Sequence, residues 1–207
     1  MLIFNHILLA AGWLFFVFLH SLMAALWFKA YIQQLIGDRY FTYYRLAYSV
    51  FAAATVVIVL LFQFFMNSKL LMNTSIPVLF AGIVFSCVGL SLMMVCIKKY
   101  FLNLSGVDVL IKKNHTQGLE KNGLHAYVRH PLYAATLLFI WSLLIIFPYL
   151  HNLIACIIIT IYTVIGIIME ERKLLIEFGE SYRAYSKKIP MIIPSLSRSA
   201  RLRKRSL

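Results

Sequence analysis

Long apolar stretches alternate with shorter polar ones along most of this chain. Polar and charged residues interrupt the apolar pattern between the stretches, and the last two stretches are shorter than the first three. A helix of about twenty apolar residues crosses the roughly 30 Å hydrocarbon core of a bilayer. The pattern predicts an all-α integral membrane bundle with about five transmembrane helices, over residues 7–28, 46–65, 76–97, 132–147 and 153–169.

The composition supports a membrane protein. Hydrophobic residues make up 62% of the 207 positions, and the mean hydropathy is +0.83. Soluble globular domains contain roughly 45–50% apolar residues, so the bilayer is the expected solvent. The three cysteines lie within predicted spans and belong to no Cys/His pattern typical of a metal site. We therefore expect no bound metal.

The basic residues predict how the chain is oriented in the membrane, because Lys and Arg concentrate in cytoplasmic loops. With five spans, nineteen of the twenty basic residues and all seven acidic residues fall on one side, and Lys69 alone falls on the other. We expect the N-terminus outside and the C-terminus in the cytoplasm. A bacterial inner (plasma) membrane is the expected location, with the chemistry on its cytoplasmic face.

The net charge of +13 does not indicate a nucleic-acid partner, because the bases flank apolar spans and no groove-reading module is present. Five of the eight residues from Arg198 to Arg205 are basic. Such a cluster attracts anionic lipid headgroups at about 1 kcal/mol per base. Membrane lipids are the expected partners of this tail.

Three regions are expected: a transmembrane scaffold (1–97), a catalytic region with an inner loop, a helical hairpin and a cytoplasmic helix (98–194), and a basic tail (195–207). Within the scaffold, residues 29–44 read as an inner loop. Tyr48 reads as an interfacial anchor. His20 near the inner end of the first span reads as a histidine bonded to a neighbouring helix, with contact to a cofactor or substrate as the alternative.

The last two predicted spans are separated only by residues 148–152, so they form an antiparallel hairpin with neighbouring inner ends. Polar residues gather at both of these ends. Pro131 fits the first turn of a helix, whose free amides favour an anionic ligand group. This arrangement predicts a pocket at the inner membrane face, formed by Arg129, His130 and Tyr133 from one span and Glu170 and Glu171 from the other.

A ligand with a carboxylate, an ammonium, a ribose and a flat base would suit this set of groups, and S-adenosylmethionine has all four. A plainer interpretation remains open for each end. Arg129 and His130 would then extend to the membrane–water interface without binding a ligand. Glu170 and Glu171 would begin a solvated amphipathic helix. From the residues alone, the hairpin predicts a small-ligand site and no particular reaction.

Three motifs take the interpretation further: residues 123–133 with the run Arg129-His130-Pro131-Leu132-Tyr133, residues 170–185 beginning Glu170-Glu171, and residues 189–194 with Pro190 and Pro194. As a set they resemble the isoprenylcysteine carboxyl methyltransferase superfamily, which also includes phospholipid N-methyltransferases and thiol S-methyltransferases. The resemblance covers about residues 118–194 and implies a membrane methyltransferase that uses S-adenosylmethionine.

By position, the resemblance implies that one group of residues binds the cofactor: His130, Pro131, Leu132, Tyr133 and Glu170, with Gln117 and Leu119 from a preceding segment and His125 where the family commonly has Tyr. Prenylcysteine-specific members resemble one another in an Arg that is thought to hold the substrate carboxylate, and Gly166 stands there in this chain. An unpaired carboxylate would be costly at that depth. A small thiol, an amine or another lipophilic acceptor is therefore favoured over a prenylcysteine carboxylate.

The expected reaction is direct methyl transfer, in which positioning contributes most of the rate acceleration. Arg129, His130 and Glu171 are the candidate catalytic residues, and either His130 or Glu171 is a candidate base. Two alternatives remain. One is an NADPH-dependent reductase similar to membrane sterol reductases, and the other is a non-catalytic accessory or transport protein. The second would be expected to show a repeat or paired broken helices, and the sequence has neither.

Overall fold

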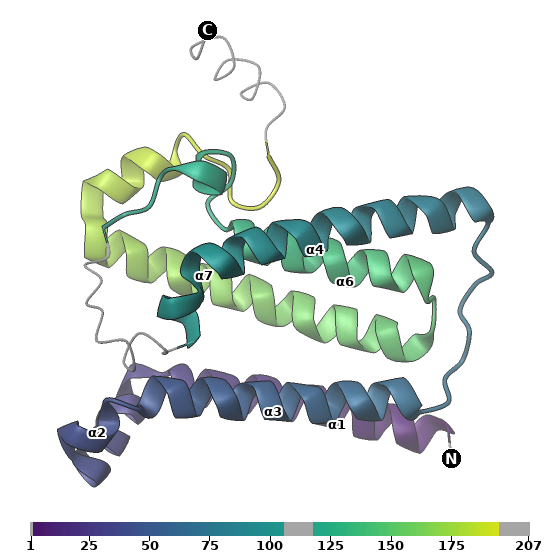
Figure 1. Cartoon of the computed structure of the whole chain (residues 1–207), viewed down its shortest axis with the longest axis horizontal. Coiled ribbons are helices and arrows are strands. Elements are labelled where there is room, and N and C mark those ends of the chain that lie inside the picture. Colours follow the sequence, from purple (N-terminus) through teal and green to yellow (C-terminus); the bar gives the residue numbers. More distant parts are fainter. Residues whose placement is uncertain (1, 106–117, 195–207) are drawn as a thin grey trace, which may run out of the picture.

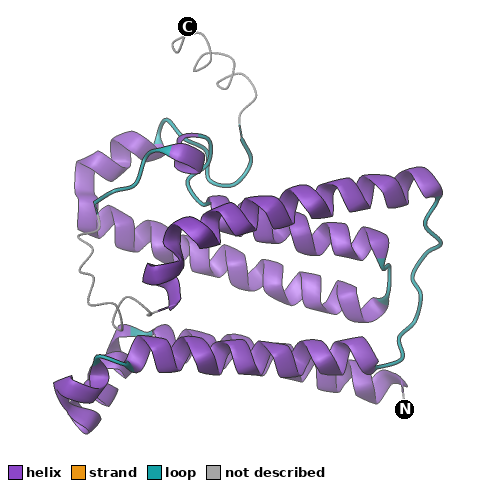
Figure 2. Cartoon of the chain, in the orientation of Figure 1, coloured by secondary structure: helices purple, strands orange, loops and turns teal. Residues whose placement is uncertain are grey.

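The computed structural model describes residues 2–105 and 118–194 (Figure 1). Helices dominate the described part, which contains no strand beyond one isolated bridge between Leu70 and Tyr149 (Figure 2). The elements are α1 (Leu2–Ala24), α2 (Leu26–Phe41), α3 (Tyr44–Phe65), α4 (Ile76–Ser105), the short 3₁₀ helix η1 (Gly123–Ala126), α6 (Pro131–Ile146) and α7 (Leu150–Ser186).

The predicted all-α membrane bundle is confirmed. Four helices, α1, α3, α4 and α7, are long and apolar enough to cross a bilayer, and α6 is a shorter apolar helix. Large apolar side chains cover much of the surface, among them Phe64 at 80% exposure and Ile76 at 83%. Such a surface suits lipid rather than water. The sidedness of the bundle remains a prediction.

The helix boundaries differ from the apolar stretches that predicted them. Residues 29–41 were expected in a loop, and that expectation is wrong because they belong to α2. α1 ends early, at Ala24, because Ala25 is extended (φ −64°, ψ 137°). α4 and α7 both continue well past their apolar parts. An apolar stretch marks the part of a helix that lies in the bilayer and does not mark the ends of the helix. Polar residues such as Lys, Gln and Glu form helix readily, so a helix can continue beyond its apolar part.

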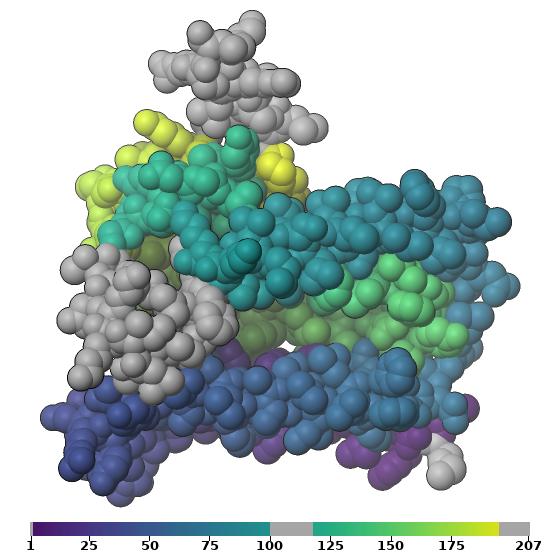
Figure 3. Space-filling view, viewed as in Figure 1, coloured from purple at the N-terminus to yellow at the C-terminus, as the bar shows by residue number. Residues whose placement is uncertain are grey.

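The helices form two layers (Figure 1): α1 and α3 make one layer, and α4, α6 and α7 make the other. In the space-filling view the surface of α6 is visible between α4 and α3 (Figure 3). α4 and α6 pack closely because α4 presents glycine at their contact. A methyl group on Gly89 would lie 2.9 Å from the backbone nitrogen of Phe139. Small residues at helix contacts permit this approach in membranes.

The two layers meet at a buried apolar cluster in which α1 contacts α7. It contains Leu9, Trp13, Met66 and Ala155. Leu9 is completely buried and Trp13 is 3% exposed. This contact fixes the scaffold helices against the hairpin formed by α6 and α7.

The hairpin itself matches the prediction. Pro131 occupies the first turn of α6, and residues 147–149 connect α6 to α7. Gly179 then breaks α7 with φ +50° and ψ −125°, a backbone conformation that favours glycine. The chain after this break turns back toward η1 (Figure 1). The end of α7 therefore lies over the start of α6.

Candidate functional site

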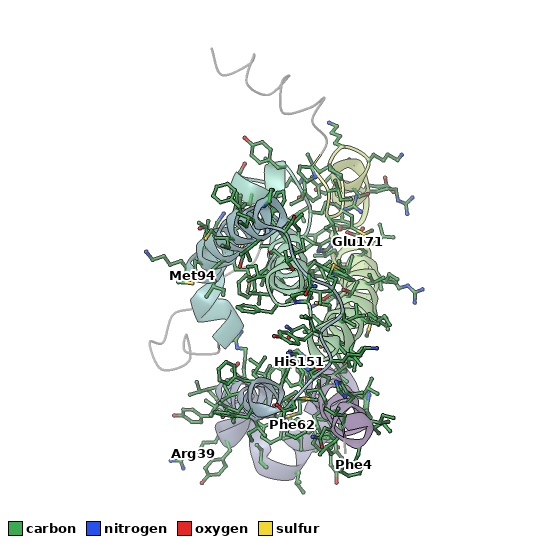
Figure 4. All side chains as sticks on the ribbon, turned by 90° about the vertical axis from the view of Figure 1, so that its right-hand side faces the viewer. Phe4, Arg39, Phe62, Met94, His151 and Glu171 are labelled. Carbon is green, nitrogen blue, oxygen red and sulfur yellow. The ribbon has the colours of Figure 1, made fainter. Side chains whose placement is uncertain are left out.

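Glu171 lies at the centre of a charged cluster where the start of α6 meets α7. The Arg129 guanidinium holds its carboxylate in a bidentate pair, with Nε and Nη2 each 2.9 Å from a carboxylate oxygen. The Arg129 and Glu171 side chains are only 10% and 19% exposed. In Figure 4 Glu171 lies with the upper group of helices, apart from Phe62 and Phe4 in the lower pair. Bidentate geometry and burial make this a strong ion pair.

The rest of the Arg129 guanidinium holds the C-terminal segment. Nη1 donates to the carbonyl oxygens of Ser186 at 2.7 Å and Ile189 at 3.0 Å. The backbone continues the same attachment, since the amide of Arg129 donates to Pro190 and the amide of His130 donates to Met191. Arg129 thus acts as a brace between α6, α7 and residues 186–191. Its donors point at the protein itself rather than at a ligand.

His130 is 4% exposed and contacts both carboxylates. Its Nε2 lies 2.7 Å from Glu171 Oε1, and its Nδ1 lies 3.7 Å from Glu170 Oε2. An ionised carboxylate only accepts hydrogen bonds, so the Nε2 nitrogen must carry the proton in the bond to Glu171. The Nδ1 nitrogen is left facing Glu170.

Tyr182 is a member of this cluster for which the sequence analysis predicted no role. Its hydroxyl donates to Glu171 Oε1 at 2.5 Å, and its side chain is nearly fully buried. Glu171 therefore accepts bonds from Arg129, His130 and Tyr182 together. The available signal was Gly179, because a glycine inside a predicted helix marks a turn that can bring later residues back.

Glu170 has a different environment, although it is the neighbour of Glu171 in sequence. Its side chain is 43% exposed, and it interacts with the Tyr133 hydroxyl. The Tyr133 ring lies 5.8 Å from the His130 ring. A methyl group on Gly166 would lie 3.9 Å from the Tyr133 hydroxyl oxygen. Glu170, Tyr133 and the Nδ1 side of His130 thus lie together around Gly166, and we call this region the space beside Gly166.

The remaining predicted cofactor residues are only partly brought together. Pro131 is buried and Leu132 is half-buried in the first turn of α6. Leu119 is half-buried in the segment before η1. Gln117 lies outside the described residues.

His125 in η1 contacts the brace rather than the space beside Gly166. Its Nδ1 donates to the Arg129 carbonyl at 3.0 Å, and its own carbonyl accepts from the Tyr185 hydroxyl at 2.7 Å. Burial lowers the pKa of its imidazole below the ordinary value of 6.5. A neutral His125 therefore links η1 to both the start of α6 and the end of α7.

A hollow of about 310 Å³ lies on the other side of this linkage, between η1 and the end of α7. None of the predicted cofactor residues lines it. Its lining residues are Lys121, Ala126, Ser181, Ala184, Tyr185, Lys188 and Ile189. We therefore assign the candidate site to the space that Glu170 and Tyr133 face, where the titratable side chains converge.

A comparison with protein families gives a match to the family described as NnrU protein over residues 8–197. The chain belongs to this NnrU protein family. The match covers both the scaffold and the candidate site. No solved structure matches the chain.

Curated proteins similar to this NnrU-family chain include methyltransferases by name. It is 35% identical over 34% of its length to methanethiol S-methyltransferase 1 of Bradyrhizobium diazoefficiens. It is 38% identical over 37% of its length to methanethiol S-methyltransferase of Pseudomonas deceptionensis. It is also 35% identical over 42% of its length to protein-S-isoprenylcysteine O-methyltransferase of Schizosaccharomyces pombe.

These matches cover 24%, 28% and 37% of the three relatives' own lengths. The chain therefore matches well under half of each relative. The relatives nevertheless agree with the resemblance that the motifs predicted, and the place of the chain beside the isoprenylcysteine methyltransferase-like proteins is confirmed. The names belong to the relatives, and what this chain catalyses is a separate question.

Proposed function

We propose that this protein is a membrane-embedded methyltransferase that uses S-adenosylmethionine. The observation that carries the proposal is the contrast between the two adjacent carboxylates. Glu171 is saturated by Arg129, His130 and Tyr182, whereas Glu170 is 43% exposed beside Tyr133. One carboxylate holds the site together, and the other has lone pairs left for a ligand.

The groups that face this space fit the proposed cofactor. The Glu170 carboxylate accepts hydrogen bonds and suits an ammonium group or ribose hydroxyls. The first-turn amides of α6 suit the carboxylate of the cofactor, since Pro131 leads the helix and the amides after it lack intrahelical partners. The Tyr133 ring offers a face to a flat base. His130, Pro131, Leu132, Tyr133 and Glu170 are the residues that would hold the cofactor, together with Leu119 and Gln117 from the preceding segment.

When bound, S-adenosylmethionine supplies a methyl group on a positively charged sulfur. The residues of the chain bind and orient this cofactor, and they exclude water from it. The cluster of Arg129, Glu171 and Tyr182 fixes His130 and the start of α6, so these residues are positioning residues in this proposal. Holding two reactants in line contributes several kcal/mol of barrier reduction. The sequence-based candidate bases Glu171 and His130 are already bonded to each other, which argues against either acting as the base.

We further infer that the methyl acceptor is a lipophilic or small thiol. Gly166 borders the space beside Tyr133 and contributes no side chain to it, so no cation is provided there for a carboxylate acceptor. Methanethiol is in the names of several similar proteins. An apolar thiol would enter through the bilayer without leaving a charge unpaired.

The proposal also covers the roles of the three regions of the chain and their position in the membrane. The scaffold (1–97) supports the catalytic region (98–194), the site faces the cytoplasm, and the tail (195–207) contacts anionic lipid. The tail lies outside the described residues. The predicted spans separate nineteen of the twenty bases from Lys69, which supports this sidedness.

The direct test is calorimetry of S-adenosylmethionine binding to the detergent-purified protein. Glu170→Gln should weaken binding by ten-fold or more, because a charged hydrogen-bond acceptor contributes roughly 1.5–3 kcal/mol. Glu177→Gln is the matched control, since Glu177 is an exposed carboxylate on the same helix. It should bind as the wild type does.

A folded wild type that binds no S-adenosylmethionine would contradict the proposal. Titration with NADPH in the same instrument then distinguishes a reductase, which would bind it, from an accessory protein, which would bind neither compound. Equal affinities for wild type and Glu170→Gln would leave the cofactor in place but move its site away from Glu170.

A further inference from the structure

A second polar cluster lies inside the bundle, where α1 meets α3 and α7. The His20 ring is held between two tyrosine hydroxyls: Nε2 lies 2.6 Å from Tyr48 Oη, and Nδ1 lies 2.5 Å from Tyr162 Oη. The three side chains come from three different helices and are all only partly exposed. We call these residues the His20 chain. Tyr48, which was predicted to be an interfacial anchor, also bonds to His20.

The His20 chain can carry a proton in either direction. A neutral imidazole has one N–H donor and one acceptor nitrogen, and a tyrosine hydroxyl both donates and accepts. Each link in Tyr162–His20–Tyr48 can therefore reverse its direction without breaking the chain. Polar groups within a membrane are costly unless paired and commonly mark proton or substrate paths.

The geometry of α7 connects this chain to the candidate site. Tyr162, Gly166 and Glu170 follow one another at intervals of one helical turn, so they share one face of α7. A methyl group on Gly166, between the other two, would lie 3.9 Å from the Tyr133 hydroxyl oxygen. Tyr133 also lies within electrostatic range of Tyr162 and Tyr48. The His20 chain therefore ends one turn of α7 away from Gly166, beside the same space as Tyr133 and Glu170.

Methylation of a thiol requires a proton acceptor, whereas methylation of a carboxylate does not. The charged cluster is poorly suited to that role, because Arg129, His130 and Tyr182 already saturate Glu171. In the proposed function Glu170 is engaged by the cofactor. Among the described residues, His20 is a titratable group outside both of these sets, with tyrosine hydroxyls on both of its nitrogens.

We propose that the His20 chain accepts the proton released when a thiol acceptor is methylated, an inference that rests on the proposed function. A sulfur–carbon bond forms to the acceptor while the carbon–sulfonium bond of the donor breaks. The thiol proton passes to the Tyr162 oxygen as the Tyr162 proton moves to His20 Nδ1. The Nε2 proton then passes to Tyr48, and the Tyr48 proton leaves for water.

The position of His20 provides an exit for that proton. His20 lies one turn before the end of α1 at Ala24, which is about 6 Å away along the helix axis. Tyr44, one turn from Tyr48 on α3, bonds its hydroxyl to the Met23 carbonyl at this end of α1. The chain thus leads from the space beside Gly166 toward the predicted cytoplasmic face.

The test compares two thiols of different acidity in wild type, His20→Gln and Tyr162→Phe. Butanethiol is protonated at neutral pH, whereas pentafluorobenzenethiol is already ionised. Loss of a general base lowers rates roughly a hundred-fold or more. We expect that loss in kcat with butanethiol and a change of less than about three-fold with pentafluorobenzenethiol. Calorimetric affinity for S-adenosylmethionine should be unchanged.

His6→Gln is the matched control, because His6 lies at the opposite end of the same helix and also bonds through both ring nitrogens, to Ser68 and the Leu2 carbonyl. It should transfer to both thiols as the wild type does. A readout without cofactor is NMR of ¹⁵N-histidine-labelled protein, with His20 assigned by its loss in His20→Gln. Butanethiol should shift the His20 signals in wild type and His6→Gln but not in Tyr162→Phe.

The outcomes separate this inference from the proposed function. Equal losses with both thiols, or no loss in His20→Gln, would overturn the His20 chain while leaving a methyltransferase in place. A wild type that binds S-adenosylmethionine but methylates carboxylates and no thiols would also overturn it. A folded wild type that does not bind the cofactor would overturn both proposals.

Discussion

Both ends of the α6–α7 hairpin carry polar networks, but one network is neutral and the other is ionic. At the end near the α6–α7 turn, Trp13 donates to Gln63, and Gln63 donates to Asn152, each at 2.8 Å. This network is neutral. At the other end the network is ionic, with Arg129 and Glu171 at its centre.

The two networks differ in whether they leave a hydrogen-bonding group available to a ligand. Gln63 accepts a hydrogen bond from Trp13 and donates one to Asn152. The neutral network therefore uses its polar groups to join α1, α3 and α7. The ionic network also saturates Glu171, yet it holds Glu170 beside it with 43% of its side chain exposed. Polar residues in a membrane bundle thus serve two purposes here. One end fastens the helices, and the other presents groups to a ligand.

The largest expected effect comes from breaking the ionic network. Arg129→Ala leaves the Glu171 carboxylate without its guanidinium and releases residues 186–191. Removing one partner of a buried pair costs about 3–5 kcal/mol, so thermal unfolding in detergent should occur at a clearly lower temperature and cofactor binding should be lost.

The matched control for Arg129→Ala is Arg183→Ala, because Arg183 pairs with Glu180 at 54% and 83% exposure. Exposed pairs contribute about 0–1 kcal/mol, so this variant should behave almost as the wild type. Equal stability of the two variants would show that Arg129 is not a brace.

A smaller effect is expected from breaking the neutral network. Gln63→Leu removes the partners of the Trp13 indole and the Asn152 amide. Leaving buried polar groups unsatisfied costs about 1–3 kcal/mol. Unfolding should become easier, whereas calorimetric affinity for S-adenosylmethionine should stay within about two-fold of the wild type. Loss of cofactor affinity in Gln63→Leu would contradict the division between the two ends.

The smallest effect concerns His125, whose pKa is lowered by burial. The unfolded chain then binds more protons than the folded one in the window from the ordinary pKa of 6.5 downward. Stability should therefore fall as pH drops below 6.5 and stay level above it. His125→Gln should flatten that part of the stability profile in thermal melts. A wild-type profile that rises on acidification would contradict the sign of this pKa change.

Much of the fold could be predicted because the bilayer imposes a simple rule on composition. The apolar stretches located the four long apolar helices and the shorter α6, and the short turn after Phe147 located the hairpin. The α2 helix was missed because its residues are mixed in polarity, and neither membrane burial nor a clear amphipathic pattern marks it. The short hairpin connection then predicted that Arg129, His130, Glu170 and Glu171 lie in one place, and the motif resemblance added the expected cofactor.

The sequence by itself determined that this chain is a helical membrane protein and that its charged residues meet at one end of a hairpin, because apolar length and loop length set both. Only the tertiary structure decided how Glu170 and Glu171 divide their roles, because that depends on the break at Gly179, which returns Tyr182 to Glu171. It alone joined His20 to Tyr48 and Tyr162. Contacts between helices distant in sequence follow from packing geometry, which no local pattern encodes.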